Sequence, residues 1–164
     1  MLIEPAHGLV ARATIGGMRT LAIDLGTRRV GLALSDEGGR LATPLDVLTV
    51  TAPEQAIDLI LPIIARESVR RIVVGLPMNM DDGSIGRVAK ETIAWARQLA
   101  SRAAIPMIFV DERLSSFDAE QSIVDRKRAG EKITRKQKKG HLDAVAAAGF
   151  LQAFLDGKLS ALRV

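Results

Sequence analysis

The order of strand-like and helix-like segments is the feature that most restricts how this chain can fold. Three apolar segments with β-branched or alternating residues come first, over residues 20–23, 30–35 and 41–50. Only short turn sequences, "GTRR" and "DEGGR", separate them. Turns this short join strands that lie next to each other and run in opposite directions, so we expect a three-stranded antiparallel meander.

Helices and buried strands alternate after the meander. The spacing of apolar residues predicts helices over 51–69, 84–102 and 141–157, and a further helix that begins at Ser115. Continuous apolar runs predict strands over 71–77 and 106–112. The chain is therefore expected to be an α/β protein, with a mixed five-stranded sheet made of the meander and two parallel strands and flanked by helices.

Polar residues mark the expected starts of these helices. Thr51 with Glu54, and Ser115 with Asp118, have the spacing of a capping box. Asp82 or Ser84 is expected to cap the helix over 84–102. The apolar face expected for that helix consists of Ile85, Val88, Thr92, Trp95 and Leu99.

Length and composition set the class of protein. A chain of 164 residues with 48% hydrophobic residues can bury one core of its own. We expect residues 19–158 to form a single domain, with a poorly ordered extension over 1–18 and a tail over 159–164. The chain has no cysteine, no recognisable export signal and no apolar run near the roughly 20 residues of a membrane span, so we expect a cytoplasmic protein without a membrane partner.

Acidic residues occupy positions where apolar segments end or begin. Asp24 ends the first strand, Asp111 and Glu112 end the last strand, and Asp143 opens the final Ala-rich helix. If these elements are neighbours, three carboxylates meet, and such a group repels itself unless hard cations such as Mg²⁺ or Mn²⁺ lie between them. Divalent cations held in this way support hydrolysis of a phosphodiester. The alternative is that the acids are unrelated strand ends and helix caps.

Four stretches around these acids carry a resemblance to a known family. They are "AIDLGTRRVGLALSD", "VVGLPMNMDDGS", "VDERLSSFDAE" and "HLDAVAAAGFLQAFLD", in the family's order and close to its spacing. In them the chain resembles the YqgF/RuvX family, a branch of the RNase H-like superfamily whose members are described as Holliday junction resolvase homologues and as pre-16S rRNA nucleases. The resemblance runs from about residue 21 to 155, and the loop "MNMDDGS" is one acid longer than the family's usual turn.

The resemblance implies an RNase H-like nuclease that uses Mg²⁺ or Mn²⁺. Its catalytic and metal-binding acids correspond to Asp24, Glu112 and Asp143, with Asp111 as the alternative to Glu112 because adjacent strand residues point to opposite faces. The implied role is 5′-end maturation of pre-16S rRNA, with the small ribosomal subunit as a possible context, by a monomer or homodimer. Cleavage of four-way DNA junctions is the alternative activity, and a non-catalytic nucleic-acid-binding assembly factor is the alternative of another class.

Basic and polar residues near the acids are candidates for binding a nucleic acid, which the net charge of +4 permits. The candidates are Arg28, Asn79, Arg113, Lys136, Lys138 and Lys139. Each has a simpler interpretation as part of a turn, a helix cap or a solvated basic face. His141 precedes Asp143 by two residues, and a metal or proton-transfer role competes there with a capping role.

Overall fold

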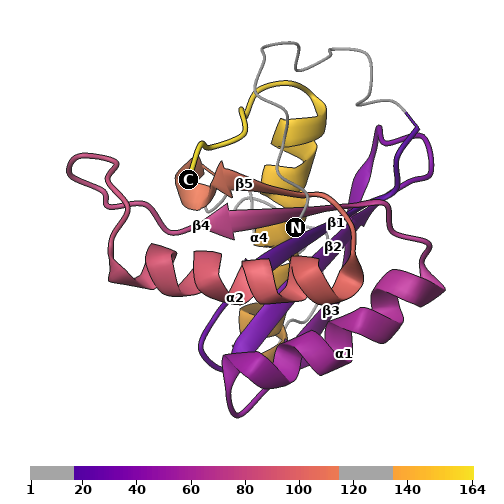
Figure 1. Ribbon diagram of the computed structural model, residues 1–164, viewed down its shortest axis with the longest axis horizontal. Coiled ribbons are helices and arrows are strands. Elements are labelled where there is room, and N and C mark those ends of the chain that lie inside the picture. The colour runs from indigo at the N-terminus through magenta and orange to yellow at the C-terminus, as the bar shows by residue number, and fades with distance from the viewer. Residues whose placement is uncertain (1–16, 115–134) are drawn as a thin grey trace.

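A five-stranded sheet forms the centre of the computed structural model, which describes residues 17–114 and 135–164, with side chains for 17–113 and 142–164 (Figure 1). The strands are β1 (Thr20–Leu25), β2 (Arg29–Ser35), β3 (Ala42–Thr49), β4 (Arg71–Leu76) and β5 (Met107–Asp111). The helices are α1 (Pro53–Arg66), α2 (Arg87–Ala103), the 3₁₀ turn η1 (Glu112–Leu114) and α4 (Arg135–Leu155). Residues 1–16 of the expected N-terminal extension lie outside the described residues. The helix expected to begin at Ser115 also lies outside them.

The sheet has the mixed topology expected from the sequence. Its strands follow the order β3-β2-β1-β4-β5. β1, β2 and β3 are antiparallel neighbours, whereas β4 pairs with β1, and β5 with β4, in parallel. The meander with two added parallel strands is therefore confirmed. Because β1, β4 and β5 run in the same direction, their C-terminal ends lie at one edge of the sheet.

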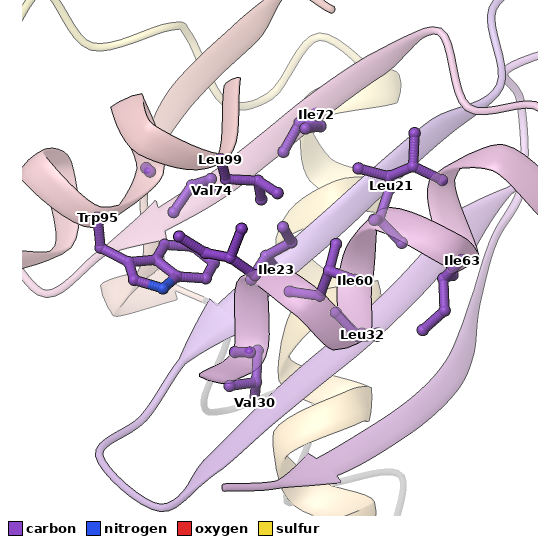
Figure 2. Packing of buried hydrophobic residues seen from close by; sticks show 14 of the residues in the cluster. Leu21, Ile23, Val30, Leu32, Ile60, Ile63, Ile72, Val74, Trp95 and Leu99 are labelled. Atoms are coloured by element: carbon purple, nitrogen blue, oxygen red, sulfur yellow. The ribbon is translucent and has the colours of Figure 1, made fainter. Parts of the chain in front are cut away.

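One face of the sheet is covered by α1 and α2, as Figures 1 and 2 show. Alternate residues of β1 point to this face, where Leu21 and Ile23 are completely buried. Ile60 of α1 and Leu99 of α2 pack against them in the larger apolar cluster. The indole Nε1 of Trp95 also donates a hydrogen bond of 2.7 Å to the Pro53 carbonyl, which joins the two helices.

The opposite face of the sheet, covered by α4, is lined by small side chains. Ala22, Ala33, Val73 and Val110 of the sheet form this second apolar cluster with Phe150 and other residues of α4. Because small side chains keep the distance between helix and sheet short, the polar groups on this side of the sheet also come close to α4.

Two glycines extend this close packing to the edge where the parallel strands end. A Cβ atom at Gly31 would lie 2.2 Å from the backbone oxygen of Asp143, and one at Gly75 would lie 2.8 Å from the Phe150 ring and 3.0 Å from Oε2 of Glu112. Gly31 is the β2 partner of Asp24. These glycines therefore admit α4 and the end of β5 to positions that a larger residue would block.

The expected helix caps are wrong for α1 and α2. Ala52 caps α1 without a side-chain hydrogen bond. The backbone nitrogen of Thr51 instead donates a 3.0 Å hydrogen bond to Oε1 of Gln55. Gly86 caps α2, again without a side-chain hydrogen bond. The helices thus begin where the chain reaches the packed interface, and burial of their apolar faces outweighs the local cap signal.

The face of α2 and the start of α4 also differ from expectation. Thr92, Trp95 and Leu99 are buried, but Val88 is 54% exposed, whereas the next residue, Ala89, is completely buried and faces the core in its place. The final helix begins at Arg135 instead of at residue 141. Asp143 therefore lies inside α4, two turns from its start, and the stabilisation of an acid by the first turn of a helix does not apply to it.

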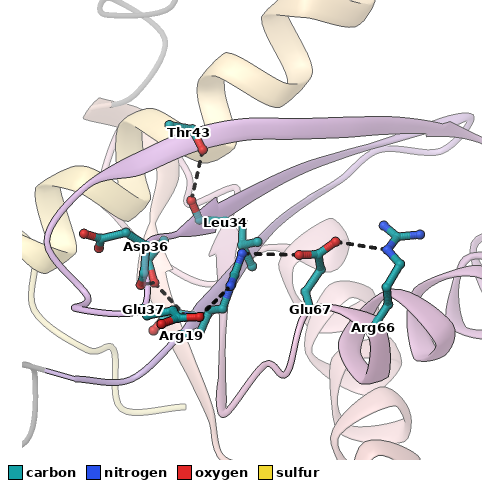
Figure 3. Close-up of polar contacts among 9 residues, drawn as sticks. Arg19, Leu34, Asp36, Glu37, Thr43, Arg66 and Glu67 are labelled. Carbon is teal, nitrogen blue, oxygen red and sulfur yellow. Dashed lines mark hydrogen bonds and ion pairs between the residues drawn. The ribbon is translucent and has the colours of Figure 1, made fainter.

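At the opposite end of the sheet, polar contacts hold the start of β1 to α1 (Figure 3). Arg19, just before β1, forms ion pairs with Glu67 after α1 at 3.3 Å and with Glu37 at 3.6 Å. Glu67 also pairs with Arg66 at 3.0 Å. Glu37 and Glu67 at this end are therefore paired with cations.

The C-terminal segment returns to β5, where the Leu162 backbone nitrogen donates a 2.8 Å hydrogen bond to the Phe109 carbonyl. Within the described residues, none of the helices combines the length and the apolar character needed to cross a membrane.

We predict that Gly31→Ala lowers the free energy of unfolding by about 1–3 kcal/mol, since the added methyl group forces α4 away from the sheet. Gly38→Ala is the matched control, because its Cβ would meet no atom closer than 3.6 Å. Urea unfolding followed by circular dichroism measures both variants. Equal stability of the two variants would contradict the close approach of α4.

Candidate active site

Asp24 lies near the C-terminal end of β1, on the face covered by α4. It alternates with Ile23 and Leu25, which belong to the cluster on the α1 and α2 face. Gly31 lies beside it on β2. Since Ile23 pairs with Val74 of β4, Gly75 lies beside it on the other strand. The carboxyl group is thus partly buried between two residues that have no side chain.

Glu112, rather than Asp111, is the acid at the end of β5 that meets Asp24. The two side chains are joined by a hydrogen bond, and Glu112 also lies over Gly75. Asp111 is bound elsewhere: its carboxylate accepts hydrogen bonds from Nε of Arg113 at 2.9 and 3.0 Å and from the Arg113 backbone nitrogen at 3.0 Å. The geometry therefore separates the two neighbouring acids that the sequence left as alternatives.

Asp143 approaches the same edge from α4. Its Oδ2 accepts a 2.6 Å hydrogen bond from Nε of Arg29, the first residue of β2. Its charge is close enough to raise the pKa of Asp24. The structure thus brings the three acids expected from the sequence to one edge of the sheet, in the order Glu112, Asp24, Asp143, and then Arg29.

Burial and mutual repulsion raise the pKa values of two of these acids. Burial, followed by the charge of Asp143, raises the pKa of Asp24 to about 6, and the hydrogen bond from Glu112 opposes this rise. Burial, followed by the charge of Asp24 and their hydrogen bond, raises the pKa of Glu112 to about 8. These are the shifts expected when carboxyl groups gather without enough positive charge to balance them.

The donor chemistry of this group fits a divalent metal ion such as Mg²⁺ or Mn²⁺, which prefers carboxylate oxygens. In the arrangement observed, however, no three His, Cys, Asp or Glu side chains of the described part of the chain are placed to hold one ion. Asp24 and Glu112 are bonded to each other, while Asp143 is bonded to Arg29. For all three carboxylates to bind one metal ion, the side chain of Asp143 would have to turn toward Asp24 and Glu112.

Two of the residues expected to bind nucleic acid, Asn79 and Arg113, also make hydrogen bonds that hold the loop between β4 and α2. Nη1 of Arg113 donates a 3.2 Å hydrogen bond to the Asn79 carbonyl, in addition to its bonds with Asp111. Nδ2 of Asn79 lies 2.7 Å from Oγ of Ser84, across the same loop. Asp82, which was expected as a cap, accepts a 2.9 Å hydrogen bond from the Ser84 backbone nitrogen. Arg113 therefore fixes this loop beside Glu112.

Of the remaining candidates for nucleic-acid binding, only Arg28 has a described side chain. Arg28 lies in the turn between β1 and β2, and its side chain is exposed. Lys136, Lys138 and Lys139 belong to the backbone of α4 before Asp143, but their side chains lie outside the described part, as does that of His141.

Sequence reasoning missed the partner of Asp143. That partner is Arg29, which lies 114 positions away in the chain. An acid inside an Ala-rich helix that packs on a sheet requires a partner, and this was the available signal. The sequence alone could not name the partner, because the position of α4 over β2 follows from Gly31.

Comparison with known proteins agrees with this fold. Residues 18–157 match the family model RuvX, described as Holliday junction resolvase. The chain belongs to this family. A relative from Rhizobium rhizogenes, named "Putative pre-16S rRNA nuclease", is 38% identical over 146 residues, which are 89% of this chain and 85% of the relative. A relative of the same name from Anaeromyxobacter is 40% identical over 141 residues, 86% of this chain and 98% of the relative.

Solved structures show the same fold at low sequence identity. RuvC of T. thermophilus, in complex with a Holliday junction substrate, has a TM-score of 0.56 at 16% identity, covering 88% of this chain and 99% of RuvC. A manganese-soaked human cytomegalovirus terminase nuclease domain has a TM-score of 0.54 at 10% identity, covering 93% of this chain and 92% of that domain. The expectation of a nuclease family with an RNase H-like fold is therefore confirmed.

We predict that the metal-free protein loses stability as the pH rises from about 4.5 to about 8, because the folded state keeps a proton on Glu112 that the unfolded chain releases in this range. Glu112→Gln removes this titration, so its stability should fall less over the same range. Urea unfolding in the presence of chelator at pH 5 and pH 8 measures the difference. Parallel pH profiles of the two proteins would contradict it.

Proposed function

We propose that this protein is a divalent-metal-dependent endonuclease that hydrolyses phosphodiester bonds in the 5′-end maturation of pre-16S rRNA. The observation that carries the proposal is the convergence of Asp24, Glu112 and Asp143 at the edge where the parallel strands end. The names of the related nucleases support the choice of substrate. Processing of rRNA would place the protein in the cytoplasm.

Asp24, Glu112 and Asp143 are the residues that would hold Mg²⁺ or Mn²⁺. When bound, such an ion lowers the pKa of a water molecule and neutralises charge on the phosphate. The chain itself contributes a rigid frame for the three acids: β1 holds Asp24 in the middle of the sheet, and the Asp111–Arg113 contacts fix the segment that carries Glu112.

The exposed turn between β1 and β2 supports contact with the nucleic-acid backbone. Arg28 projects from this turn next to Arg29, which reaches Asp143. Lysines 136, 138 and 139 precede Asp143 along α4, and we assign them to the same contact. Cations arranged around a carboxylate group can hold phosphates in place while the acids act on one of them.

Cleavage of four-way DNA junctions is the second candidate activity. The description of the matching family favours it, and the T. thermophilus relative was solved with such a substrate. This reaction requires two cuts in one junction, so it would need a homodimer with paired sites, whereas trimming of an rRNA end needs a monomer only. The mass of the complex with junction DNA distinguishes the two.

We predict that Asp24→Asn lowers the cleavage rate by at least about a hundredfold, because loss of even an outer partner of a metal ligand costs about ten- to a hundredfold. End-labelled pre-16S 5′ RNA, a four-way DNA junction and plain duplex are compared with Mg²⁺, Mn²⁺ or chelator. Asp46→Asn, an exposed acid on β3, is the matched control and should cleave normally.

The substrate cleaved fastest separates rRNA maturation from junction resolution. If the wild-type protein binds these nucleic acids but cleaves none of them, the enzyme proposal is wrong and a non-catalytic assembly factor takes its place.

We also predict that Arg28→Ala weakens binding of the catalytically inactive protein to its substrate and reduces the slope of log affinity against log salt by about one. The physical reason is the loss of one phosphate contact and of the counterion that it releases. Arg66→Ala, at the end of α1 far from the three acids, is the control and should leave the slope unchanged. Fluorescence anisotropy between low and moderate salt measures both, and equal slopes would remove Arg28 from the interface.

A further inference from the structure

The ion pair between Arg29 and Asp143 occupies one of the three acids assigned to the metal. Nε of Arg29 lies 2.6 Å from Oδ2 of Asp143, the distance of a strong charge-assisted hydrogen bond. The two side chains are 29% and 26% exposed, so water and ions can reach the pair. It is therefore neither sealed in the core nor an ordinary surface contact.

The backbone around Arg29 is held firmly, so the side chain is delivered to one place. The Gly26 nitrogen donates a 2.9 Å hydrogen bond to the Arg29 carbonyl, and a Cβ at Gly26 would lie 2.6 Å from that oxygen. Arg29 also pairs with Thr49 of β3. The tight turn thus fixes the backbone from which the Arg29 side chain extends to Asp143.

Electrostatics explains why a cation is needed at this position. Asp24 and Glu112 relieve their repulsion through a hydrogen bond with each other, and Asp143 contributes further negative charge to Asp24. The guanidinium of Arg29 offsets the charge of Asp143. In the arrangement observed, the group does not gather three ligands for one ion among the described residues.

We propose that Arg29 is a built-in substitute cation: it holds Asp143 in the metal-free protein and releases it when Asp24, Glu112 and Asp143 together take up a divalent cation. The inference rests on the proposed metal site and goes beyond it, because it assigns to Arg29 a competition with the metal. Arg29 is thus a positioning residue for Asp143, and breaking its ion pair is part of the free energy of metal binding.

The competition has a measurable sign. If metal binding must break the ion pair, removing Arg29 strengthens metal binding, by about tenfold for one charge-assisted hydrogen bond. If Arg29 instead holds Asp143 in the position that the metal needs, removing it weakens binding. Loss of any nearby positive charge also strengthens cation binding slightly, so a control of equal charge is required.

Isothermal titration calorimetry with Mn²⁺ alone, without nucleic acid, tests the proposal on the full chain. Arg29→Gln should bind Mn²⁺ about tenfold more tightly than the wild type, and clearly more tightly than Arg28→Gln, which loses the same charge one residue away. An unchanged or weaker affinity, or equal gains in the two variants, would overturn the proposal. Circular dichroism checks that both variants are folded.

Nuclear magnetic resonance of the wild-type protein supplies a test that needs no variant. The Arg29 side-chain Nε–H signal should lose its hydrogen-bonded shift as Mg²⁺ saturates the site, and persistence of that shift would also overturn the proposal.

The proposed metal site and the proposed role of Arg29 fail in different ways. If Asp24→Asn abolishes Mn²⁺ binding but Arg29→Gln does not strengthen it, only the role of Arg29 is wrong; if the wild type binds no divalent cation, both are wrong.

Discussion

The close packing of α4 on the sheet is the constraint on which the rest of the structure depends. This face of the sheet presents alanine and glycine, and at Gly31 the helix backbone occupies the space of a side chain. Any larger residue there would move Asp143 away from β1, because the backbone of Asp143 itself lies against Gly31. The site therefore depends on the lack of a side chain at Gly31 of β2 and at Gly75 of β4.

The acids gathered by this packing create an electrostatic problem that the fold solves locally. Asp24 and Glu112 share a hydrogen bond and have raised pKa values, Asp143 is bound to Arg29, and Asp111 is bound to Arg113. At the other end of the sheet Arg19 pairs directly with two acids. The edge with incomplete compensation is the one at which we propose that a divalent cation and a phosphodiester bind.

Patterns that span many residues predicted the structure well, whereas the local signals for helix caps did not. The strands and their mixed order followed from apolar periodicity and short turns, which report burial along whole segments. The caps predicted at Thr51 and Ser84, and the place of Val88 on the apolar face, were wrong, because packing of the helix decides where it begins and which of its residues face the core. Asp143 was expected at a helix start and lies inside α4 for the same reason.

The sequence by itself determined the element order, the family motifs and the presence of acids at the ends of apolar segments, because these properties are local or periodic along the chain. Only the tertiary structure decided that Glu112 rather than Asp111 meets Asp24, and that Arg29 holds Asp143. The physical reason is that each choice depends on the distance between segments far apart in the chain. That distance is set by how closely α4 and β5 approach the two glycines of the sheet.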